Sequence, residues 1–175
     1  VLSANGSIAR MYSQEGGAFK LARTYPVKDS FLLASKLIMP GALGSVSIIV
    51  SFAIIASLKT DLIAENLVLG AGILLIYLGH LLYSASLDFT NPRNPFGEVS
   101  FLSSNENRSV ILAFALSFLL TILFYYFTQD PIIWVGNVQT TSSFKVLLIG
   151  LFYFLMNVVS YNKKVRYVYA KGENL

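Results

Sequence analysis

Four long apolar stretches, separated by more polar segments, set the pattern of this chain. They cover residues 37–58, 66–86, 110–127 and 144–161. Each approaches the roughly 20 residues that a helix needs to cross a hydrocarbon core of about 30 Å. Within lipid, a spanning segment has to satisfy its own backbone hydrogen bonds, as a helix does. The pattern therefore predicts an all-α fold, an integral membrane bundle of four transmembrane helices.

The first 36 residues have a different pattern, in which apolar and charged side chains alternate. Ile8 and Phe19 are interleaved with charged residues such as Glu15, and Gly16 with Gly17 interrupts the run. This spacing is typical of one or two short amphipathic helices. Such helices lie at a membrane surface or against a partner protein.

The distribution of Lys and Arg predicts the orientation of the bundle. Eleven of these residues precede the first stretch, lie between the second and third, or follow the fourth. Lys59 and Lys145 are the two that fall on the other side. Because basic residues accumulate on the cytoplasmic side of a membrane, both termini and the loop over 87–109 are expected in the cytoplasm. The loop over 128–143 then faces outward.

These patterns divide the chain into three parts. Residues 1–36 form an amphipathic cytoplasmic segment, residues 37–161 form the four-helix transmembrane domain, and residues 162–175 form a basic cytoplasmic tail.

Composition supports the membrane class and excludes several functions. Hydrophobic residues make up 55% of the chain and charged residues 13%, which leaves too little polar surface for a soluble domain of 175 residues. The net charge of +4 is explained by the basic residues at the helix ends, so no nucleic-acid partner is expected. The chain has no cysteine, which excludes disulfides and thiolate chemistry. The motifs of phosphate-binding loops, serine hydrolases and zinc proteases are also missing from the sequence, so neither a catalytic residue, a cofactor nor a metal site is predicted.

A few polar side chains inside the apolar stretches are candidates for a substrate path. His80 is the single histidine, and an ionisable group inside a span is a functional hypothesis by default. A hydrogen-bonded histidine that only packs the bundle is the competing interpretation. The hydroxyl and amide groups have the same two interpretations, because small and polar residues also hold membrane helices together. The candidate path comprises Ser47, Ser51, His80, Ser117, Thr121 and Asn157.

Two segments resemble signatures of the integral-membrane permeases of bacterial ATP-binding-cassette exporters. The first is the run SQEGGAFKLARTYPV over residues 13–27, followed by Ser30, Leu33 and Lys36 at the start of a span. The second is LDFTNPRNPFGE over residues 87–98, in which Pro95 and Phe96 stand where the family usually has an aromatic Trp. The order of a motif, two spans, a second motif and two spans is similar as well. Members of that family carry further helices before the first motif, so we expect this chain to be the carboxyl-terminal part of a permease, or else a half-size relative.

The resemblance implies a function and partners. The first motif would lie on a short cytoplasmic helix that inserts into a groove of a separate ATPase subunit, in a bacterial cell membrane. The chain itself would not be an enzyme, and a second permease subunit or the remaining part of the permease would complete the transporter, with membrane lipid around it. The residues expected to dock on the ATPase are Glu15, Gly16, Gly17, Phe19 and Leu21.

Two other functions stay open from the sequence. The chain is alternatively a membrane scaffold that binds a cytoplasmic partner and transports nothing. The third hypothesis is an intramembrane enzyme that uses His80 and nearby tyrosines. The apolar spans are compatible with a lipid, a hydrophobic peptide or a drug-like molecule as substrate, and they argue against a highly charged solute.

Overall fold

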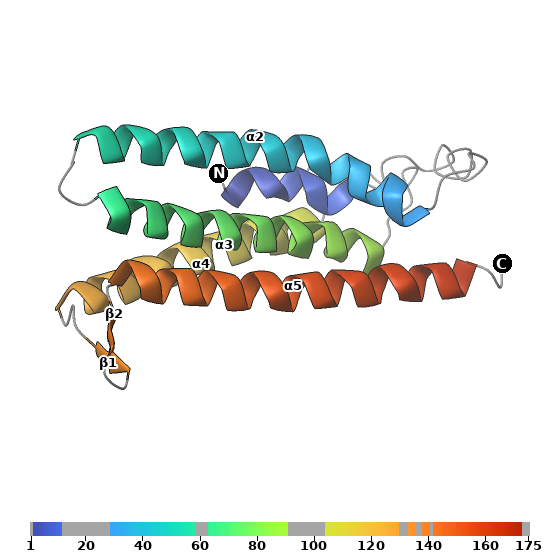
Figure 1. Cartoon of the computed structure of the whole chain (residues 1–175). Coiled ribbons are helices and arrows are strands. Elements are labelled where there is room, and N and C mark those ends of the chain that lie inside the picture. Colours follow the sequence, from blue (N-terminus) through green and yellow to red (C-terminus); the bar gives the residue numbers. More distant parts are fainter. Residues whose placement is uncertain are drawn as a thin grey trace.

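The computed structural model describes residues 2–11, 29–58, 63–90, 104–129, 133–135, 138–140 and 142–172. Four long helices dominate it and lie side by side (Figure 1). In chain order the elements are the 3-10 helix η1 (Leu2–Arg10), α2 (Asp29–Leu58), α3 (Ile63–Thr90), α4 (Ser104–Gln129), β1 (Ile133–Val135), β2 (Val138–Thr140) and α5 (Ser142–Gly172).

Each predicted apolar stretch lies inside one of the long helices. The parts long and apolar enough to cross a membrane are Ala34–Leu58, Ile63–Asp88, Asn105–Leu123 and Ser143–Arg166. The prediction of a four-helix membrane bundle is therefore confirmed. The helices extend beyond the apolar residues, because a helical backbone does not end where its side chains become polar. As a result, the predicted basic tail is a continuation of α5 as far as Gly172.

A short hairpin adds to the predicted fold. β1 and β2 pair antiparallel, with Trp134 opposite Gln139, in the segment expected to be a loop between the last two spans. Three residues in each strand are too few to change the class of the fold.

The two ends of the bundle differ in charge. α2 begins, α3 ends, α4 begins and α5 ends at the same end, which Figure 1 shows opposite the hairpin. We call this the basic end, because it carries Lys36, Arg108, Lys163, Lys164 and Arg166. The opposite end, which we call the hairpin end, carries Glu65 and Lys145 at the starts of α3 and α5.

α3 is the central helix of the bundle. In its most apolar window 44% of the residues are buried, compared with 6% for α2. α5 is its most extensive partner, and the two backbones meet at Gly72 and Gly150. A Cβ atom added to Gly150 would lie 2.5 Å from the carbonyl oxygen of Gly72, so only residues without side chains allow this approach.

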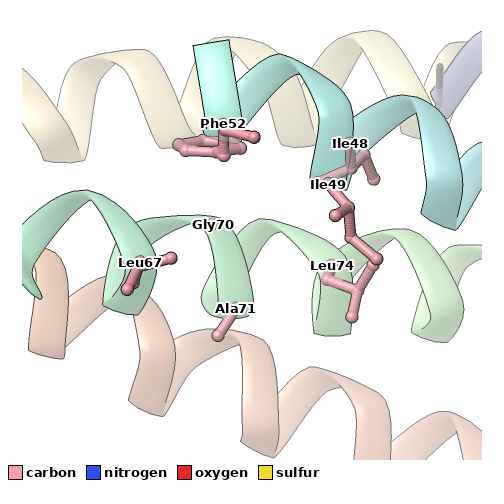
Figure 2. Close-up of a pocket in the computed structure, with 8 residues that line it drawn as sticks. Ile48, Ile49, Phe52, Leu67, Gly70, Ala71 and Leu74 are labelled. Carbon is pink, nitrogen blue, oxygen red and sulfur yellow. The ribbon is translucent and has the colours of Figure 1, made fainter. Parts of the chain in front are cut away.

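α2 packs mainly on α3, and the two helices leave a groove between them toward the hairpin end (Figure 2). The groove has a volume of about 290 Å³. It is lined by residues without polar side chains: Ile48, Ile49, Phe52, Ala53, Leu67, Gly70, Ala71 and Leu74.

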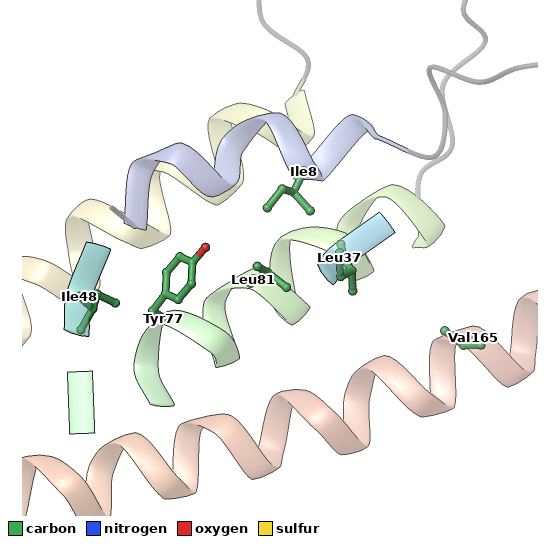
Figure 3. Close-up of a cluster of buried hydrophobic side chains, with 7 residues drawn as sticks. Ile8, Leu37, Ile48, Tyr77, Leu81 and Val165 are labelled. Atoms are coloured by element: carbon green, nitrogen blue, oxygen red, sulfur yellow. The ribbon is translucent and has the colours of Figure 1, made fainter. Parts of the chain in front are cut away.

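η1 packs on α3 and α4 rather than standing apart from the bundle. Ile8 and Ala9 are buried, and Ile8 joins an apolar cluster with Tyr77 and Leu81 of α3 (Figure 3). The amphipathic pattern of the N-terminal segment is thus explained over η1 by contact with this chain's own helices. The remaining members of the cluster are Leu37, Ile48, Ala85 and Val165.

The outward faces of the bundle are apolar. Large side chains on α2, α4 and α5 are more than half exposed, including Met39, Phe118 and Phe152. A soluble protein rarely exposes such a surface, whereas a membrane protein presents it to lipid or to further helices.

Candidate functional site

The contact between α2 and α3 is organised around Tyr77. Its hydroxyl donates a hydrogen bond of 2.6 Å to the carbonyl oxygen of Pro40, which lies inside α2. Its ring lies over Gly44, where an added Cβ would collide with the ring atoms. Pro40 has no N–H and so removes one hydrogen bond from the helix ladder, which weakens α2 at this point. Tyr77 therefore joins α3 to α2 at the turn that contains Pro40.

A second group of polar side chains is buried where η1, α3 and α4 meet. We call this group the polar junction. It comprises Asn5 of η1, His80, Ser84 and Asp88 of α3, and Asn105, Glu106 and Ser109 of α4. Each of these residues is less than 7% exposed.

The centre of the polar junction is a pair of serines. The hydroxyl oxygens of Ser84 and Ser109 lie 2.6 Å apart, and Ser84 also donates to the carbonyl oxygen of His80 at 2.9 Å. Since a serine hydroxyl has one proton, Ser109 is the donor to Ser84. The bond fixes the register of two antiparallel helices, so that His80 lies on the level of Ala113 and Asp88 on the level of Asn105.

η1 closes the junction on its third side. An added Cβ at Gly6 would lie 3.0 Å from the Cγ2 atom of Val110 and 4.0 Å from the carbonyl oxygen of Glu106. On α4, Glu106 lies three residues before Ser109, and Val110 directly follows it. Asn5, next to Gly6, is 1% exposed, and its side-chain nitrogen has no hydrogen-bond partner among the described residues.

His80 is completely buried in the junction. Its ring stacks on Tyr83, with ring centroids 6.0 Å apart and an angle of 17° between the planes. Neither ring nitrogen has a hydrogen-bond partner within the described part of the chain. The histidine that the sequence singled out therefore faces the interior of the protein and not the lipid.

One basic side chain turns inward at the basic end. The Nζ atom of Lys164 donates to the hydroxyl of Ser86 at 3.1 Å, and this hydroxyl donates to the carbonyl oxygen of Tyr83 at 2.7 Å. The bond connects α5 to the last turns of α3. No group of three or more His, Asp or Glu residues that would hold a metal ion occurs over the ranges that the structure describes.

The candidate path residues do not come together in the described structure. Ser47 and Ser51 are exposed on α2, Ser117 and Thr121 are exposed on α4, and His80 is buried on α3. Asn157, on α5, is partly buried. Four of these side chains bond to a carbonyl oxygen one turn earlier on their own helix, at 2.8 Å: Ser51 to Ser47, Ser117 to Ala113, Thr121 to Ser117 and Asn157 to Tyr153. A continuous polar path through these six residues is thus not formed.

The predicted docking residues lie outside the described residues. This applies to Glu15, Gly16, Gly17, Phe19 and Leu21. Their role therefore stays a prediction.

Sequence reasoning missed most of the polar junction. It singled out His80 but not Ser84, Ser109 or Asn5. A usable signal was present, since polar and small residues recur every four positions at 80, 84 and 88 and again at 105, 109 and 113. Two such stripes on neighbouring antiparallel helices pair in reverse order.

No protein family, curated protein or solved structure was found to match this chain.

Proposed function

We propose that this chain is the membrane-spanning permease subunit of an ATP-driven exporter in a bacterial cell membrane. A separate ATPase subunit hydrolyses ATP and docks on residues 13–27, and both termini lie in the cytoplasm. The proposal rests on the two sequence segments that resemble such permeases and on the arrangement of the elements that flank the first of them.

The observation that carries the proposal is the connection made by the docking segment. Residues 12–28 join η1 to α2, and both of these elements pack on α3. η1 contacts α3 through Ile8, and α2 contacts it through Pro40 and Gly44. A displacement of the docking segment would therefore act on two contacts of the central helix.

α2 is the element that such a displacement moves most readily. It is the least buried spanning helix, and Pro40 weakens its backbone close to its contact with Tyr77. ATP-driven closure of the partner would shift the balance between two packings of α2 on α3, because a partner can favour the arrangement that it binds better. Substrate would cross as this balance changes, with no catalytic residue in this chain.

Co-purification with an ATPase tests the proposal. The chain is isolated in mild detergent from its native membrane, and the preparation is searched for a protein with a phosphate-binding loop. Glu15→Lys and Phe19→Ala should release that protein and abolish stimulation of its ATPase rate, because both changes remove docking contacts. Asp61→Lys, a charge reversal between the first two spans on the side expected to face outward, is the matched control and should leave both readouts unchanged. Retention of the ATPase by both docking variants would refute the proposal.

The second candidate function is a membrane scaffold. It is favoured by the separation of the candidate path residues over exposed faces of α2 and α4 and the interior of α3. Reconstitution with the partner ATPase in vesicles distinguishes the two functions, because a scaffold binds the ATPase without ATP-dependent movement of any solute.

A further inference from the structure

The geometry points to an internal water site at the polar junction, in which water bonds to the ring nitrogens of His80. This inference does not depend on the proposed function, since it concerns the hydration of the bundle and not what the bundle transports.

The first step is the burial of the histidine. His80 is 0% exposed, and both of its ring nitrogens lack a hydrogen-bond partner among the residues described. A neutral imidazole presents one donor and one acceptor, and buried groups of this kind almost always have partners in native proteins. Membrane lipid supplies none. The ring therefore requires a polar molecule or group inside the protein.

The second step is the polarity of the surroundings. One turn from His80, Ser84 bonds to Ser109, and on the third side Asn5 has a buried nitrogen without a described partner. Gly6, beside Asn5, lies against Glu106 and Val110, on either side of Ser109 in α4. Buried polar atoms without a described partner thus occur on two elements that pack together, α3 and η1, and an internal water typically makes two to four bonds to such groups.

The third step is the size of the neighbouring side chains. Ala113, which is buried, lies across from His80 in the register set by the two serines. Small side chains leave more room beside an imidazole than the leucines that fill the apolar cluster do. A small hydrogen-bonding molecule is therefore the ligand that fits, and water is the one always present.

The single histidine makes the test specific. The full chain is labelled with isotopic histidine and methionine and reconstituted in lipid bilayers, so that one imidazole signal arises from His80. Magnetisation is then transferred from water protons in solid-state NMR. We expect magnetisation from water to reach the His80 ring at short mixing times. It should not reach the methyl groups of Met39 and Met156, which face outward within the spans.

Two variants complete the test. Asn5→Ala should reduce the early transfer to His80, because it removes a second partner for the water. Ser51→Ala, a change on the exposed face of α2, should leave the transfer unchanged.

Two outcomes would overturn the inference. One is an imidazole signal that receives no magnetisation from water at short times. The other is a ring nitrogen that shows a direct bond to a protein group in the remainder of the chain. If the ATPase docking experiment fails while the water transfer is seen, the inference stands and the proposed function does not.

Discussion

The hydroxyl of Tyr77 on α3 donates to the carbonyl oxygen of Pro40 on α2, and the ring of Tyr77 covers Gly44 one turn further along α2. The Tyr77 side chain thus contacts α2 in two ways, through a hydrogen bond to Pro40 and through close packing of its ring on Gly44. Because α2 is the least buried of the described spanning helices, we expect this contact to have a large effect on where α2 lies.

We expect Tyr77→Phe to loosen α2. The ring and its fit over Gly44 remain, while a hydrogen bond worth about 1 kcal/mol is lost. The position of α2 can be measured by cross-linking cysteines introduced at Gly41 and Leu81, since the chain has no cysteine of its own. The cross-linking yield should fall in the variant.

Tyr125→Phe serves as the control, because Tyr125 is 60% exposed on α4. An equal fall in yield with Tyr125→Phe would show that the bond to Pro40 is not responsible.

Gly150→Leu should separate α3 from α5. The added side chain would meet the backbone of Gly72, which cannot move aside as a flexible side chain does. Overpacking of this kind costs about 1–3 kcal/mol, and a backbone collision lies at the upper end of that range. Thermal unfolding in detergent should therefore begin at a clearly lower temperature.

Ala115→Leu is the matched control for that change, because Ala115 is exposed on α4. An unfolding temperature for Gly150→Leu equal to that of the control would contradict the close approach of the two backbones.

A double-mutant cycle should detect the bond between Ser84 and Ser109. Bonds between membrane helices show coupling energies that average about 0.6 kcal/mol and reach about 1.7 kcal/mol. The single and double alanine variants are compared by equilibrium unfolding. For comparison, Ser51→Ala and Ser109→Ala should be additive, because Ser51 bonds within its own helix. Additivity in the Ser84 and Ser109 cycle would exclude the bond.

Single cysteines test the orientation of the bundle. A membrane-impermeant maleimide should label Lys145→Cys in intact cells, because the hairpin end is expected to face outward. Lys163→Cys at the basic end should be labelled only after permeabilisation. The reverse labelling pattern would place the docking segment outside the cell, where a cytoplasmic ATPase could not bind it. That result would contradict the proposed function.

The spans were predictable because length and apolarity leave few alternatives in lipid. A run such as 66–86 has to form a helix, whichever helices it contacts. The hairpin had a sequence signal as well, since Gly136 and Asn137 separate two short β-branched runs. These residues were nevertheless expected to form a loop, because the apolar spans on both sides of them were the stronger pattern.

The interior contacts were not predictable in the same way. His80 was singled out by its chemistry alone, but its burial depends on the elements that pack on α3, which the pattern within α3 does not identify. The partner of Tyr77 is a backbone carbonyl, which every residue has, so the sequence does not indicate which carbonyl accepts the bond. The Ser84 and Ser109 bond requires the register of two helices, which periodicity within either helix does not determine.

The meeting of Gly72 with Gly150 has a consequence for how the protein is made. α3 emerges from the ribosome well before α5, so it enters the bilayer without its principal partner. Until α5 is inserted, lipid tails are expected to cover the glycine face of α3, and α5 then displaces them. The packing of α3 is therefore completed only when α5 is inserted, and a chain truncated before Phe144 would keep lipid on the closest-packing side of its central helix.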